Sequence, residues 1–273
     1  MNKSAFGNRM KMYEKLVEQK LFPMIPICAR LDGKAFHSFT KGLQKPYDTD
    51  FIDIMTETTK KLVDMTNASI GYTQSDEISL IWLQKNTRQE IFMGGKRSKM
   101  ISVIASATTA IFNSLISSYL PQKSGIQALF DCRVWNVINK EEAANYLLWR
   151  EQDATRNSIQ SAGQSVFSHK QLMNKSCDDI QEMLFSEKGI NWNDYPSDFK
   201  RGTYIQRRCI RKWFTTEELN KLPPLHNAHK NPDLLIERHE IRYLDMPKFS
   251  SVTNKTDVIF EGFNPEQIEE DNG

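Results

Sequence analysis

The spacing of apolar residues at the beginning of the chain predicts a helix, a strand and a second helix. Residues 8–20 have a helical pattern, and the apolar run 25–31 then stops at Asp32-Gly33, as a buried strand stops at a turn. Over residues 50–65 the apolar positions fall three and four apart, on one face of a helix that Thr49 would cap. The chain therefore leaves the strand, turns, and crosses back as a helix.

The pattern continues with a hairpin, a helix and a strand. The β-prone runs 70–74 and 78–83 flank Ser75-Asp76-Glu77, which is too polar and too short for anything except a hairpin turn. Apolar residues three and four apart then predict a long amphipathic helix, which Ser98 would cap and which ends near residue 120. Residues 128–138 alternate between apolar and polar, as a strand does.

This order of elements predicts the fold. A strand, a helix, a two-stranded hairpin, a helix and a strand make the split β-α-β arrangement, in which a four-stranded antiparallel sheet is backed by two helices. We therefore predict an α+β, ferredoxin-like domain over residues 1–140. A helix over 140–161 then begins a helical and basic C-terminal α/β extension, residues 141–273, that packs on this domain.

Composition and charge bear on the partners of the protein and on its compartment. The 273 residues are 39% hydrophobic and 26% charged, with a net charge of +2, so any RNA contact must come from local patches. No apolar run approaches the roughly 20 residues of a membrane span, and the N-terminus lacks the apolar stretch of a secretory signal. We expect a cytoplasmic protein with no membrane partner. The cysteines form no C-x-x-C pair, which argues against a zinc knuckle or a disulfide framework; they are Cys28, Cys132, Cys177 and Cys209.

Two carboxylates are predicted to meet at one end of the sheet. Asp32 ends the first strand and Asp76 lies at the tip of the hairpin, and these strands are neighbours in a split β-α-β sheet. Carboxylate oxygens and a backbone carbonyl are ligands that Mg²⁺ accepts, and a pair of such ions assists phosphoryl transfer. The alternative is that Asp-Gly and Ser-Asp-Glu are ordinary turn residues, and the pattern alone leaves it open.

Several motifs resemble those of the tRNA(His) guanylyltransferase family. The two longest cover the end of the first strand and the hairpin, and the others lie in the long helix and in the extension. Together they span most of residues 1–215. They are Arg30-Leu31-Asp32-Gly33-Lys34-Ala35-Phe36-His37-Ser38-Phe39, Gln74-Ser75-Asp76-Glu77, Ser98-Lys99, Trp149-Arg150, Gln152-Asp153, Asn191-Trp192-Asn193-Asp194-Tyr195-Pro196 and Phe199-Lys200-Arg201-Gly202-Thr203.

The resemblance implies an enzyme with a polymerase-like palm that extends RNA in the 3′-to-5′ direction. The 5′ phosphate of a tRNA is activated with ATP or is already a triphosphate, and the 3′-hydroxyl of an incoming nucleotide such as GTP attacks it. Two Mg²⁺ ions would be held by Asp32, the Gly33 carbonyl and Asp76, with Glu77 as a further catalytic residue. The resemblance also implies a set of nucleotide-binding residues, which comprises Arg30, Asp32, Gly33, Lys34, Ala35, Phe36, His37, Ser75 and Asp76.

Two basic segments are candidates for binding phosphates. Lys96 and Lys99 share one face at the start of the long helix, where the helix dipole also favours anions, and we expect them to bind the triphosphate. Residues 200–212 contain six basic residues and no acid, and we expect this segment to bind RNA. For both segments the alternative is a solvated basic face. The RNA candidates are Lys200, Arg201, Arg207 and Arg208.

One departure from the family pattern bears on the substrate. Members that add guanosine to tRNA(His) have a histidine in the later helix, where this chain has Thr155. This departure resembles the guanylyltransferase-like branch, which repairs 5′-truncated tRNAs by templated addition. We therefore expect tRNA 5′-end repair, with addition of the extra guanosine to tRNA(His) as the alternative.

Two other classes of protein stay open. A nucleotide cyclase or cyclic-dinucleotide synthase uses a similar palm but converts NTP without RNA. A non-catalytic RNA-binding protein would keep the basic segment without needing both aspartates. The resemblance further implies a homotetramer that binds tRNA and nucleoside triphosphates.

Overall fold

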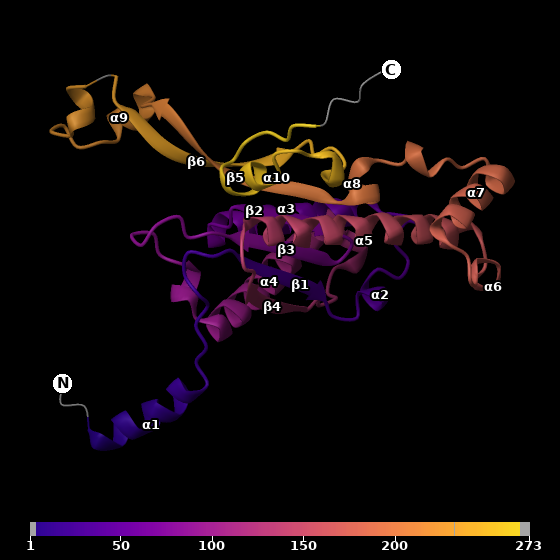
Figure 1. Cartoon of the computed structure of the whole chain (residues 1–273), viewed down its shortest axis with the longest axis horizontal. Coiled ribbons are helices and arrows are strands. Elements are labelled where there is room, and N and C mark those ends of the chain that lie inside the picture. Colours follow the sequence, from indigo (N-terminus) through magenta and orange to yellow (C-terminus); the bar gives the residue numbers. More distant parts are fainter. Residues whose placement is uncertain (1–3, 232, 268–273) are drawn as a thin grey trace.

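The computed structural model describes residues 4–231 and 233–267. A six-stranded sheet lies at its centre (Figure 1), with the strands in the order β4-β1-β3-β2-β5-β6 and every neighbouring pair antiparallel. The strands are β1 (Ile27–Gly33), β2 (Ile70–Gln74), β3 (Glu77–Trp82), β4 (Phe130–Asn136), β5 (Thr203–Trp213) and β6 (Leu235–Leu244).

The predicted α+β fold is confirmed, and the size of the sheet needs correction. The predicted strands form its β4-β1-β3-β2 part in the split β-α-β order. The sheet has six strands rather than four because β5 of the C-terminal extension pairs with β2 over Thr203 to Gln206, and β6 then pairs with β5. The extension therefore continues the sheet. The predicted division at residue 140 stays a prediction.

Helices cover both faces of this sheet. On one face α3 and α4 pack on apolar residues of β1, β3 and β4, and on the other α5 packs with the C-terminal segment. The helices are α1 (Ala5–Leu16), α2 (Phe36–Phe39), α3 (Thr49–Thr66), α4 (Arg97–Tyr119), α5 (Lys140–Val166), α6 (His169–Leu172), α7 (Cys177–Lys188), α8 (Ser197–Arg201), α9 (Thr216–Asn220) and α10 (Lys255–Phe260).

Two predicted helix caps are wrong by one or two residues. Asp48, not Thr49, caps α3, since its side chain accepts from the N–H of Phe51 at 3.0 Å. α4 begins after Lys96 without a side-chain cap, so Ser98 lies inside its first turn. By length and hydropathy alone α4 would pass as a membrane span, but it packs on the sheet and α3.

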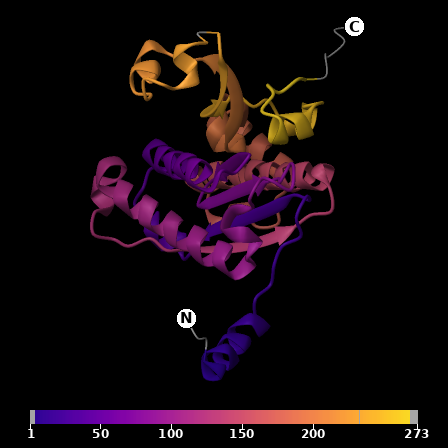
Figure 2. The same cartoon turned by 90° about the vertical axis from the view of Figure 1, so that its left-hand side faces the viewer.

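Three parts project from this body. Beyond Arg207, β5 pairs only with β6 within the described part of the chain, and this two-stranded arm carries α9 at its tip (Figure 1). The second half of α5 extends beyond the ends of the strands and packs on α6 and α7 to form a helical lobe (Figure 1). α1 extends in another direction (Figure 2), and none of its residues is buried.

Candidate active site

Asp32 and Asp76 lie side by side at one end of the sheet. Asp32 is the penultimate residue of β1, directly opposite Glu77 of β3. Asp76 occupies the two-residue turn between β2 and β3, and its carbonyl oxygen accepts from the N–H of Gly33 at 3.1 Å. The antiparallel β1–β3 pairing thus brings together two residues that lie 44 positions apart in the printed sequence, as the sequence predicted.

The electrostatics of this end favour a bound cation. Burial raises the pKa of Asp76, and the negative charge of Asp32 raises it further. Ser75, at φ +49°, donates its hydroxyl to Asp76 Oδ1 at 3.2 Å and lowers this pKa in part. Within the described ranges, no lysine or arginine lies within 4.0 Å of either carboxylate. Two carboxylates that repel each other would be stabilised by a divalent cation.

The donor atoms fit Mg²⁺ rather than a metal that needs several side chains. In residues 4–231 and 233–267, no three His, Cys, Asp or Glu side chains are grouped to hold a metal by themselves. Mg²⁺ is usually bound by one or two carboxylates, and waters and substrate phosphates complete its shell. Asp32, Asp76 and the carbonyl of Gly33 supply oxygen atoms only. The residues present therefore suit magnesium together with a nucleotide.

A further carboxylate, which the sequence prediction did not include, lies on the neighbouring strand outside the pair. Asp131 of β4 is directly opposite Asp32, and residues opposed in an antiparallel pair point to the same face of the sheet. Asp131 is exposed, and its nearest recorded cation is Arg133 at 3.9 Å. The sequence held a signal for this position. Residues 128–138 alternate as a strand, and the split β-α-β fold places that strand next to the one that carries Asp32.

Glu77, predicted as a catalytic residue, is buried in an ion pair. Arg150 of α5 donates to both of its oxygens, at 2.6 and 2.8 Å, and Arg30 lies 3.9 Å away. Burial raises the pKa of Glu77, although both arginines act against this rise. Arg150 also donates to Asp153 at 2.8 Å. This network connects α5 with the strand that follows the hairpin turn, so Glu77 and Arg150 hold the position of Asp76.

The segment after β1 combines packed and exposed residues. Phe36 is buried among four other phenylalanine rings, whose centroids are 5.0 to 6.1 Å away, so its side chain belongs to the core. A Cβ at Gly33 would collide with this ring, which explains the glycine by packing. Ala35 has a left-handed backbone (φ +56°), and Lys34 and His37 are exposed.

A cleft of about 250 Å³ opens beside the hairpin turn. Ser75, the loop that contains Lys45, and the middle of α5 line it. Tyr47 and Phe199 stack at 4.7 Å and form part of its wall. A cleft with partly exposed ring surface next to paired carboxylates suits a nucleobase.

Lys96 and Lys99 lie away from the two aspartates within this chain. α4 begins near the other end of β1, because Arg97 Nε donates to the carbonyl oxygen of Val134 at 2.9 Å. The carboxylate end of β1 lies near the middle of α4. The structure therefore does not bring the two lysines and Asp32 into one cluster.

The basic segment begins near the carboxylates. Arg201 ends α8, and its carbonyl oxygen accepts from the hydroxyl of Tyr72 on β2 at 2.7 Å. Gly202, at φ +80°, passes so close to Thr73 that a side chain would collide with its backbone. Lys200 donates to the carbonyl oxygen of Asn193 at 2.5 Å and lies over the ring of Trp192.

The rest of the basic segment runs along the arm, away from this end of the sheet. The N–H of Arg207 donates to the carbonyl oxygen of Ser69, the residue before β2 and far from the hairpin turn. Several basic residues of the arm form ion pairs with glutamates of β6 and α9. These glutamates lie elsewhere in the sequence, so the pairing could not be predicted from the basic segment alone. The ion pairs that involve predicted basic residues are Arg208–Glu240, Arg211–Glu237, Lys212–Glu218 and, at α4, Lys96–Glu18.

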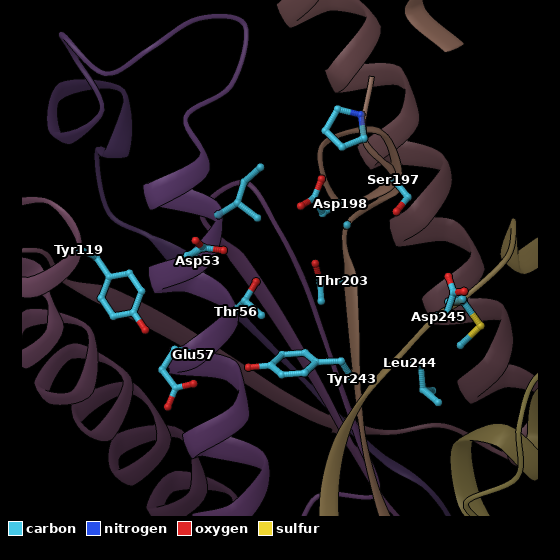
Figure 3. Close-up of a pocket in the computed structure, with 14 residues that line it drawn as sticks. Asp53, Thr56, Glu57, Tyr119, Ser197, Asp198, Thr203, Tyr243, Leu244 and Asp245 are labelled. Carbon is cyan, nitrogen blue, oxygen red and sulfur yellow. The ribbon is translucent and has the colours of Figure 1, made fainter. Parts of the chain in front are cut away.

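A second cavity, of about 450 Å³, is too acidic for a polyphosphate (Figure 3). Asp53 and Glu57 of α3 line it together with Asp198, Tyr243 and Asp245. Burial raises the pKa of Asp53, and the negative charges of Asp50 and Asp198 add to the rise. The cleft beside Ser75 is therefore the better candidate for a nucleotide site.

The sequence is similar to known tRNA(His) guanylyltransferases. A family model described as tRNAHis guanylyltransferase matches residues 7–138. The tRNA(His) guanylyltransferase of Saccharomyces cerevisiae is 29% identical over 225 residues, which cover 76% of this chain and 92% of that protein.

Two solved structures are also similar. A bacterial tRNA(His) guanylyltransferase-like protein in complex with ATP has 40% identity and a TM-score of 0.70, over 74% of this chain and 88% of that one. A second bacterial guanylyltransferase-like structure, in complex with GTP, has 31% identity and a TM-score of 0.68, over 90% and 94% of the two chains.

Proposed function

This chain belongs to the tRNA(His) guanylyltransferase family of nucleotidyltransferases, and from that premise we propose that it adds nucleotides to the 5′ end of tRNA in the 3′-to-5′ direction. The observation that carries the proposal is the meeting of Asp32 and Asp76 beside a cleft that suits a nucleotide. The two similar bacterial proteins are complexes with ATP and GTP, which supports nucleoside triphosphates as substrates.

The residues of this chain have distinct roles in the proposed reaction. Asp32 and Asp76, with the Gly33 carbonyl, would hold two Mg²⁺ ions, which activate a hydroxyl and neutralise charge on phosphates when bound. The backbone after Asp32, with Ser75, would orient the nucleotide. Glu77 and Arg150 keep the hairpin turn in place, so both carboxylates face the same reacting atoms.

The proposed reaction is a nucleotidyl transfer in two steps. The 5′ phosphate of the tRNA is first joined to AMP from ATP, with release of pyrophosphate, unless it already carries a triphosphate. The 3′-hydroxyl of the incoming nucleotide then attacks this 5′ phosphorus. AMP or pyrophosphate leaves, and the hydroxyl proton passes to solvent or to a nearby base.

We propose templated repair of 5′-truncated tRNA as the main activity. Thr155 stands where members that add guanosine to tRNA(His) have histidine, and the identity of 40% is with a guanylyltransferase-like protein rather than with one of those members. Guanosine addition to tRNA(His) is the second candidate, favoured by the similarity to the yeast enzyme. A homotetramer in the cytoplasm is part of the same proposal, and light scattering would test the assembly.

The deciding experiment offers the purified protein a tRNA that lacks its first nucleotide, with ATP, GTP and Mg²⁺, and maps the 5′ end. We expect extension by one nucleotide, with Asp32→Asn as the inactive control. No extension of any truncated tRNA would remove the proposal. Incubation with labelled NTP alone separates the other classes, because a cyclase forms product without RNA and an RNA-binding protein forms none.

A further inference from the structure

A cavity of about 590 Å³ lies in the helical lobe, beyond the cleft at the hairpin turn. It is bounded by α5, α6, the start of α7 and the loop that contains Lys45. Phe167, Leu172 and Ile180 form its apolar part. None of the residues considered above as catalytic lines this cavity.

The charged side chains that line it are lysines. Lys45 and Lys175 line it together with His169 and the amides of Gln160 and Gln164, and among the described residues no aspartate or glutamate does. In the described residues, none of these basic side chains has a carboxylate within 4.0 Å, whereas several basic residues of the arm are paired with glutamates. Lysine and amide side chains are the usual partners of nucleic-acid phosphates.

The cavity continues the candidate active site along α5. Lys45 lines both the cleft beside Ser75 and this cavity, so the two are neighbours. The cleft takes its α5 lining from Ala154 to Ser161, and the cavity takes its own from Gln160 and Gln164. At 1.5 Å per residue the centres of these two linings are about 7 Å apart along the helix. That is roughly two nucleotides of a stacked strand at about 3.4 Å each.

We propose that this cavity binds the phosphate backbone of the RNA strand that enters the active site, about two nucleotides from the reacting end. The inference rests on the proposed function and adds a subsite that places the strand. Lys175 and His169 contact phosphates from the lobe, and Lys45 contacts the stretch between the lobe and the cleft. The subsite reads no sequence, because its groups recognise phosphate rather than bases.

The test compares two lysines of the same lobe. Lys175 lines the cavity and Lys170 does not, although both are exposed and lie five residues apart in the printed sequence. We expect Lys175→Gln to weaken binding of 5′-truncated tRNA roughly three- to tenfold and to reduce the slope of log Kd against log salt concentration by about one. Lys170→Gln should change the Kd by less than about twofold. Equal effects of the two variants would overturn the subsite.

A kinetic arm identifies the source of the phosphate. The KM for GTP should be the same in Lys175→Gln and wild type if the cavity holds RNA. A KM for GTP that rises while tRNA affinity stays constant would assign the cavity to the nucleotide and overturn the inference. The wild-type extension reaction is run beside both variants. If wild type extends no tRNA, the proposed function has failed; if it extends tRNA and Lys175→Gln binds as wild type, only the subsite has failed.

Discussion

Asp32 and Asp76 are the residues whose loss should affect chemistry most and folding least. Both are partly exposed, and they repel each other, so removing one relieves repulsion rather than core packing. We expect Asp32→Asn and Asp76→Asn to lower kcat at least about a thousandfold, because an amide supplies oxygen without charge. Nucleotide addition is measured with a 5′-truncated tRNA, and thermal unfolding confirms the fold.

Asp131→Asn is the matched control for these variants. Asp131 faces the same side of the sheet beside Asp32 but is exposed at the edge, on β4. We expect its kcat to stay within about tenfold of wild type, since exposed charges act weakly. Near-normal turnover in Asp32→Asn, or equal losses in all variants, would contradict the assignment of the two aspartates.

The buried pair of Arg150 and Glu77 should separate stability from activity. Arg150→Met leaves the Glu77 carboxylate buried without its bidentate partner, which costs about 3–5 kcal/mol of unfolding free energy. Adding Glu77→Leu removes the buried charge, so the double variant should regain most of the lost stability. Urea denaturation measures this recovery.

Activity should not recover in the same double variant. Glu77 follows Asp76 directly, and its anchoring to α5 fixes the hairpin turn. We therefore expect kcat to stay low with KM for GTP little changed. Recovery of both stability and kcat would mean that the pair serves folding alone.

At the scale of elements, Glu151 connects α5 with β5 and the C-terminal segment. Its two oxygens accept from the hydroxyl of Tyr204, at 2.9 Å, and from the N–H of Phe249, at 2.8 Å. Burial raises the pKa of Glu151 above 4.5, and the two hydrogen bonds only partly oppose the rise. A raised pKa in the folded state favours the protonated form, so this contribution to stability is full below pH 4.5 and is lost as pH rises through the folded pKa.

The unfolding free energy of Glu151→Gln should therefore increase relative to that of wild type as pH rises. The neutral amide does not titrate, so the difference in unfolding free energy should grow by about 1.4 kcal/mol for each unit by which the pKa is raised. Urea denaturation of both proteins from pH 4.5 upward measures it. The exposed Glu141→Gln is the control. A difference that stays constant with pH would show that Glu151 does not titrate in this window.

The elements also show what sequence could predict. β1 to β4 were predictable because their apolar positions repeat locally, and Asp32 met Asp76 because the hairpin order fixes their neighbours. Pairings over longer separations left no local signal. Arg150 and Glu77 are 73 residues apart. The glutamates opposite Arg208 and Arg211 lie on β6, and the sequence pattern did not predict that β6 pairs with β5. The sequence likewise could not show which part of α4 lies beside Asp32. Lys99 is in the first turn of this helix, which lies near the other end of β1.

At the scale of the whole molecule, the remaining question is which tRNA the enzyme selects. Thr155 lies in α5, whose neighbouring residues Ala154, Asn157 and Ser158 line the cleft beside Ser75. An imidazole at this position would be a candidate for handling phosphate or a proton during activation. Under the proposed function, correct base pairing would then supply geometry that protein contacts do not supply.

We therefore expect Watson–Crick pairing, not tRNA identity, to set specificity. The kcat/KM for a 5′-truncated tRNA with a template nucleotide should exceed that for non-templated guanosine addition to full-length tRNA(His) by at least about tenfold, which corresponds to about 1.4 kcal/mol. Both substrates are compared at the same Mg²⁺ and nucleotide concentrations. Thr155→His tests the cause, because a gain confined to tRNA(His) would assign the preference to this position. A wild-type preference for full-length tRNA(His) would instead place the chain with the guanosine-adding members and show that Thr155 does not mark the branch.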